Sequence, residues 1–226
     1  MRRILALVAA GVAAVLAFRF WVSERRQDSL ARREAWVLSQ GAQADEASSP
    51  KPQEGHKALA EAAFDETRRK VTYDPSYVKI PYPGGDVPAD RGVCADVLVR
   101  VFRRIGVDLQ KEVHEDMEAH FGDYPNLWNL RKPDPNIDHR RVPNLMNFFR
   151  RRKAELKATD KAGDYVPGDL VAWDLGRGVL HIGIVSDRRS ADGKRFQVVH
   201  NVGSGQVLED VLFAWKVLGH FRWAGP

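Results

Sequence analysis

The first two-thirds of the chain carry apolar residues at the three-to-four-residue spacing of helices. The clearest case is residues 94–105, where an apolar stripe ends just before Gly106, a residue type common at helix C-caps. The stripe consists of Leu98, Val101, Phe102 and Ile105. The same spacing predicts helices over residues 57–71 and 143–156, with a shorter helix after Gly106.

The pattern changes after these helices to short segments rich in β-branched and aromatic residues. Strands are predicted at Leu170–Trp173, His181–Ser186, Phe196–Asn201 and Val217–Trp223. The pair Asp192-Gly193 supplies a hairpin-like turn between the second and third of these strands. Helices that come first and strands that come later predict an α+β fold.

The first 56 residues differ from the rest in composition. An apolar run from Ile4 to Val22 follows two arginines and is interrupted only at Arg19, so residues 1–22 are predicted to be a signal peptide or an N-terminal membrane anchor. Residues 23–56 are charged and then rich in Ala, Gln, Ser and Pro, which predicts a flexible tether. Residues 57–226 are predicted to be the folded domain, located in the periplasm and either released there or anchored to the inner membrane.

The net charge of +5 is concentrated in the same N-terminal part of the chain. Residues 1–26 hold five arginines and one glutamate, so the remainder carries a net charge of only +1. A nearly neutral domain offers no general basis for binding nucleic acid. Hydrophobic residues make up 44% of the chain, which is enough for a real core.

Cys94 is the only cysteine, which excludes an internal disulfide and a zinc site built from cysteines. It stands at the predicted start of a helix, where the helix dipole favours a thiolate and would lower its pKa. Two histidines, His181 and His200, follow on predicted strands. A cysteine before a helix with later strand histidines is the layout of a papain-like thiol catalyst, although a free cysteine is often only a small buried hydrophobe.

Three spaced motifs resemble the NlpC-type cell-wall cysteine peptidases. They are Gly92-Val93-Cys94-Ala95-Asp96, Val166-Pro167-Gly168-Asp169-Leu170-Val171-Ala172-Trp173 and His181-Ile182-Gly183-Ile184-Val185. Residues 57–224 also resemble an exported bacterial family of unknown function that is grouped with the papain-like fold, with Asn136–Leu145 as a further signature. The sequence departs from NlpC members in having Val-Cys-Ala for Asp-Cys-Ser and an insert at about residues 110–160.

The resemblance implies a papain-like fold in which N-terminal helices, including the nucleophile helix, pack on an antiparallel sheet. It implies that Cys94 is the nucleophile, that His181 is the general base and that His200 orients His181. Strand alternation places Asn201 on the face opposite His200, which we expect to be away from the cleft. The implied activity is hydrolysis of peptide bonds in peptidoglycan stem peptides, without a cofactor.

Further polar residues are candidates for contacts with a substrate. Arg140 and Arg141 have the shape to clamp a carboxylate, although a solvated pair at a helix start explains them equally well, and Asp96 beside the cysteine is a third candidate. No metal site is predicted. The acidic and amide residues near Pro135 suit a turn network, and the two histidines at 114 and 120 suit a helix surface.

Two other functions fit the same residues. One is a catalytically silent module of the same fold that binds the cell wall or assists its assembly. The other is a thiol acyltransferase, or an amidase acting on another amide, because one triad serves several acyl acceptors. The expected partners are peptidoglycan or its peptides, and the inner membrane if the N-terminal segment is retained.

Overall fold

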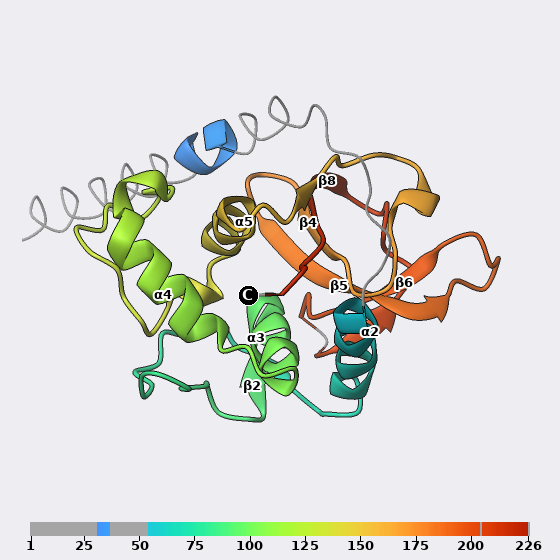
Figure 1. Ribbon diagram of the computed structural model, residues 1–226, viewed down its shortest axis with the longest axis horizontal. Helices are drawn as coiled ribbons and strands as arrows, with labels where there is room; N and C mark the ends of the chain where they lie inside the picture. Colours follow the sequence, from blue (N-terminus) through green and yellow to red (C-terminus); the bar gives the residue numbers. More distant parts are fainter. Residues whose placement is uncertain (1–30, 37–53, 204, 226) are drawn as a thin grey trace, which may run out of the picture.

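The computed structural model describes residues 31–36, 54–203 and 205–225 (Figure 1). The predicted signal or anchor segment at 1–22 lies outside the described residues, as does most of the predicted tether at 23–56; residues 31–36 of that tether are helical. In the described part of the chain, no helix is long and apolar enough to cross a membrane.

Helices precede the main sheet along the chain, so the predicted α+β class is confirmed. The helices are α2 (Glu54–Glu66), α3 (Cys94–Arg104), α4 (Leu109–His120) and α5 (Val142–Arg151). The 3₁₀ turns are η1 (Phe121–Asp123), η2 (Asp138–Arg140) and η3 (Ala162–Asp164). The predicted insert at 110–160 therefore contains most of α4, the turns η1 and η2, all of α5 and the short strand β3 (Glu155–Leu156).

Six strands form one antiparallel sheet in the order β3-β8-β4-β5-β6-β7. Their bounds are β3 (Glu155–Leu156), β4 (Leu170–Asp174), β5 (Leu180–Arg189), β6 (Phe196–His200), β7 (Val207–Glu209) and β8 (Lys216–Phe221). A separate parallel pair joins β1 (Thr72–Tyr73) to β2 (Arg91–Gly92), just before α3. The sequence pattern missed β3 and β7, which hold only two and three residues.

The two faces of the sheet have different partners. Ile182 and Ile184 on β5 pack with Ala172 against the helices, and α2 and α3 lie side by side on this face (Figure 1). Val185, Val198 and Trp173 point the other way and pack on Leu212 and Tyr165. This split follows from the alternation of side chains along a strand, and it decides where each candidate site residue points.

A buried ionic cluster ties the start of β4 to the end of the chain. The Asp169 carboxylate accepts hydrogen bonds from Arg222 at 2.7 and 2.8 Å and lies 2.7 Å from His220 Nε2. Burial by itself raises the pKa of Asp169, but Arg222 and His220 outweigh it and lower the pKa overall. The Pro-Gly-Asp motif of the sequence therefore has a structural role in this protein.

Candidate functional site

Cys94 occupies the first position of α3, as the sequence predicted. Val93 is the N-cap residue, and its backbone N–H donates to the Asp96 carboxylate at 2.6 Å. The thiol lies against β5, where the backbone N–H of Ile182 donates to it. Ile182 directly follows His181, so α3 brings the thiol to within one residue of the proposed base.

The thiol is buried, and burial dominates its acidity. Burial raises the pKa of Cys94 to about 11, and the charge of Asp96 adds to the rise, while the N–H groups of Ile182 and Ala95 lower the pKa by less. The lowered pKa expected from the helix start is therefore wrong for this state of the protein. Loss of hydration destabilises the thiolate by more than the helix terminus and the N–H groups stabilise it.

His181 and His200 lie next to each other, as the sequence predicted for the two histidines. His181 Nε2 is 2.9 Å from His200 Nδ1, and His200 Nε2 is 3.0 Å from the Glu209 carboxylate. Both histidines are buried, whereas the Glu209 side chain is 49% exposed. Burial, reinforced by the neighbouring His200, lowers the pKa of His181 to about 3.

This chain of three groups fixes which nitrogen carries each proton. An ionised Glu209 can only accept a hydrogen bond, so His200 Nε2 carries a hydrogen and His200 Nδ1 is free to accept one. His181 Nε2 must then donate to His200, which leaves the lone pair on His181 Nδ1. Glu209 was missed at the sequence level because the short strand β7 that carries it was not predicted.

The Cys94 thiol and the His181 imidazole lie on opposite faces of β5. His181 points to the sheet face of Trp173 and Trp215, and its ring is stacked on Trp173 at 5.6 Å between centroids. Ile182 points to the opposite face, toward α3. Among the described residues no hydrogen bond joins the Cys94 thiol to the His181 ring. The structure thus brings Cys94 to the backbone beside His181 but leaves the two reactive groups unbonded.

Asn201 points away from His200, as strand alternation predicted, and its side chain is bonded on the α3 side of the sheet. Its amide nitrogen donates to the carbonyl of Gly92 at 3.2 Å, two residues before Cys94. The face opposite His200 is the face that α3 covers. Asn201 is fully buried there and supports the start of α3.

Arg140 and Asp96 bond to each other and are not available to a substrate, which corrects their assignment. The guanidinium donates to the two Asp96 oxygens at 2.8 and 3.0 Å, and both side chains are 2% exposed. Arg140 also donates to the carbonyls of Ser76 and Asp74. The pair fastens the first turn of α3 to η2, so its role is structural.

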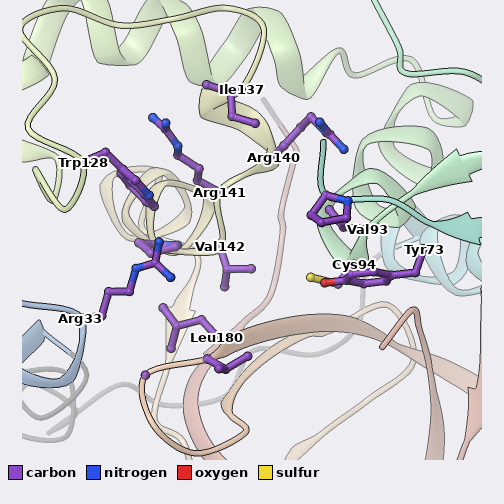
Figure 2. Close-up of a pocket in the computed structure, with 14 residues that line it drawn as sticks. Arg33, Tyr73, Val93, Cys94, Trp128, Ile137, Arg140, Arg141, Val142 and Leu180 are labelled. Carbon is purple, nitrogen blue, oxygen red and sulfur yellow. The ribbon is translucent and has the colours of Figure 1, made fainter. Parts of the chain in front are cut away.

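Arg141 does line a cavity, which has a volume of about 370 Å³ and also reaches Cys94 (Figure 2). The Arg141 guanidinium lies 4.1 Å from the centre of the Trp128 ring and donates to Asp138 at 3.1 Å. Tyr73 and Arg33 line the same cavity and were not singled out from the sequence. They come from a two-residue strand and from the tether, neither of which carries a recognisable motif.

The polar residues near Pro135, together with Asp116 and His114 on α4, are used in local structure. Asp134 bonds to the backbone and side chain of Asn136 and to the Tyr77 hydroxyl, which confirms a turn network there. Asp116 accepts from Tyr124 and Arg151 at 2.6 and 2.7 Å. His114 packs edge-on against Tyr82.

Comparison with known proteins gives the family. The family described as "Domain of unknown function (DUF1287)" matches residues 60–223. The chain belongs to this family. A curated relative, "Uncharacterized protein YijF" of Escherichia coli (strain K12), is 49% identical over 166 residues, which cover 74% of this chain and 80% of that protein. No solved structure matches the chain.

Proposed function

We propose that this DUF1287 protein is an exported thiol hydrolase with the papain-like fold of the NlpC type, and that it cleaves peptide bonds in peptidoglycan stem peptides. One observation carries the proposal. A thiol in the first turn of a buried helix meets β5 beside His181, and that histidine is in turn bonded to His200. The cavity at Cys94 gives a substrate access to the thiol.

In the proposed reaction His181 Nδ1 takes the thiol proton while the Cys94 sulfur attacks the carbonyl carbon of the scissile amide. The backbone N–H of Cys94 and a neighbouring donor stabilise the oxyanion. The carbon–nitrogen bond then breaks, His181 returns the proton to the leaving amine, and a thioester remains. Water attacks the thioester with its proton passing to His181, and the thiol is regenerated when the carbon–sulfur bond breaks.

The resting site is neutral in this account. A thiol with a pKa of about 11 and an imidazole with a pKa of about 3 do not form an ion pair at neutral pH. Because the His181 ring lies on the face of β5 opposite to α3, proton transfer requires substrate binding to reorient the ring toward the thiol. Catalytic hydrogen bonds that are long or absent in a free enzyme often tighten in the substrate complex.

The same acidities favour a second candidate, a catalytically silent module that holds peptide in the cavity. A buried thiol that stays protonated has little nucleophilic character, and no hydrogen bond to His181 activates it. In such a module Cys94 would be a small buried hydrophobe and the histidine pair would only stabilise the sheet. A reaction assay separates the two candidates.

The assay incubates purified protein with purified muropeptides in H₂¹⁸O and weighs the products by mass spectrometry. A hydrolase yields shorter peptides in which the new carboxyl group carries one ¹⁸O from water. A thiol acyltransferase yields adducts with the acceptor and no such label, and a binding module yields no product. Intact muropeptides after long incubation, at a protein concentration that shows binding, would overturn the hydrolase proposal.

Export is a separate proposal that rests on the arginine-flanked apolar run at residues 4–22. A reporter that is active only outside the cytoplasm, fused after Pro226, is expected to be active. A matched fusion that lacks residues 1–22 is expected to be inactive. Activity from neither fusion, with the full-length fusion intact and soluble in the cytoplasm, would contradict export.

A further inference from the structure

Two arginines converge on one tryptophan in the wall of the Cys94 cavity. The guanidinium carbons of Arg141 and Arg33 lie 4.1 and 5.8 Å from the centre of the Trp128 ring. Figure 2 shows these three side chains on one side of the cavity, with Cys94 and Tyr73 on the other. The residues come from three separate segments of the chain, so the fold and not local sequence assembles them.

The positive charge at this wall is only partly matched. Arg141 donates to Asp138 through one nitrogen, and the nearby Arg140 guanidinium is engaged with Asp96 and two backbone carbonyls. The Nε of Arg33 is buried and has no hydrogen-bond partner among the described residues. Burial, together with the charge of Arg33, lowers the pKa of Arg141, although Asp138 and Asp134 oppose the change. Two guanidinium side chains therefore line the cavity, and one of them has a buried Nε with no hydrogen-bond partner among the described residues.

We propose that Arg33, Trp128 and Arg141 form a subsite that binds a free carboxylate of the peptide ligand held in the cavity. The guanidinium fork matches the two oxygens of a carboxylate, and stacking on an indole ring holds the fork in a fixed orientation. Such an anion would supply the missing acceptor for Arg33 and relieve the repulsion between the two arginines. The subsite deepens the proposed function, on which it rests, because it specifies a substrate with an acidic group near the bond that is cleaved.

The size of the cavity agrees with this ligand class. A volume of about 370 Å³ falls in the range of small-molecule and short-peptide sites. Apolar residues such as Leu180, Val142 and Ile137 make up much of the remaining lining. A short peptide with one carboxylate placed at the arginines satisfies both the apolar and the charged parts of the wall.

The test measures binding without turnover. Cys94→Ala protein is titrated calorimetrically with the free stem tripeptide and with the same peptide after its carboxylates are converted to amides. We expect the free peptide to bind at least tenfold more tightly than the amide. That preference should disappear when Arg141→Gln or Arg33→Gln is added, and it should persist when Arg131→Gln, an exposed arginine outside the cavity, is added instead.

Arg141→Lys provides a second variant that keeps the charge and loses the fork, and we expect it to keep only part of the preference. Thermal melting of each variant shows whether it is folded. Equal binding of the two peptides, or a preference that survives Arg33→Gln and Arg141→Gln, would overturn the subsite. A preference without any hydrolysis by the wild-type protein would instead overturn the proposed hydrolase and leave the subsite standing.

Discussion

His181 Nε2 lies 2.9 Å from His200 Nδ1, and the two rings meet edge-on at an angle of 79°. With Glu209 accepting from the far nitrogen of His200, this contact leaves a lone pair on His181 Nδ1. His181 therefore keeps one unprotonated ring nitrogen, whereas burial keeps the Cys94 thiol protonated by raising its pKa to about 11.

Glu209 is expected to act through His200 as a positioning residue. Replacing it with Leu removes the acceptor and frees His200 to rotate or change tautomer, so kcat on a muropeptide should fall by roughly tenfold with little change in KM. Glu209→Gln keeps a carbonyl oxygen that can accept and should retain more activity than Glu209→Leu. The expected losses are modest because the side chain is half exposed and its charge is screened by water.

A pH–rate profile distinguishes this role from a merely structural one. Loss of the carboxylate removes the group that favours protonated His200, so the acid limb of the profile should move to lower pH in Glu209→Leu. Asp210, the next residue, is bonded to Arg195 on the surface and gives the matched control Asp210→Leu. If both variants kept the wild-type profile, the role of Glu209 would be refuted.

The acidity of Cys94 is accessible directly because the chain has no other cysteine. We expect the rate of alkylation by iodoacetamide to keep rising up to pH 10, since burial raises the thiol pKa to about 11. The urea-unfolded protein should level off above an ordinary thiol pKa of about 8.5. A folded protein whose rate levels off below pH 8 would show that the thiol is activated, against the structure.

Asn201→Ala is expected to destabilise the fold. The substitution leaves the carbonyl of Gly92 and the backbone N–H of Gly203 without the partners that the Asn201 amide supplies. Losing such buried hydrogen bonds costs roughly 1–3 kcal/mol in unfolding free energy. Denaturant unfolding measures the loss, with Asn147→Ala, whose bond is at the surface, as a control expected to change little. Equal stability of Asn201→Ala and wild type would contradict the placement of this side chain.

His139 makes stability depend on pH. Burial, and then the charge of Arg140, lowers its pKa to about 4, so between pH 6.5 and 4 the unfolded chain binds a proton that the folded protein does not. Stability must therefore rise with pH across this window, by about 3 kcal/mol from this group alone. His139→Gln should flatten the dependence of Tm on pH, whereas His120→Gln, at an exposed site, should not. The same slope in all three proteins would contradict this origin.

The sequence was most informative about features that depend on a single helix or strand. The helix from Cys94 to residue 104 and the strands that carry His181 and His200 follow from local periodicity, because each buries one continuous stripe. The adjacency of the two histidines also follows, because β5 and β6 are joined by a hairpin.

The sequence was least informative where partners come from distant segments. Arg140 looked available to a substrate because its partner Asp96 is 44 residues away, and only the packing of η2 against α3 brings the two charges together. The prediction that the pKa of Cys94 is lowered was wrong for a similar reason. A helix start is visible in the sequence, but the burial that outweighs it is created by β5 and the cavity wall.

The most direct test of the account compares wild type, Cys94→Ala and His181→Ala as catalysts on one purified muropeptide. We predict hydrolysis by the wild type and a loss of more than roughly 10³-fold in both variants, since one lacks the nucleophile and the other the base. His200→Ala should retain measurable activity. Cleavage by Cys94→Ala at the wild-type rate, or no cleavage by the folded wild-type protein, would contradict the account.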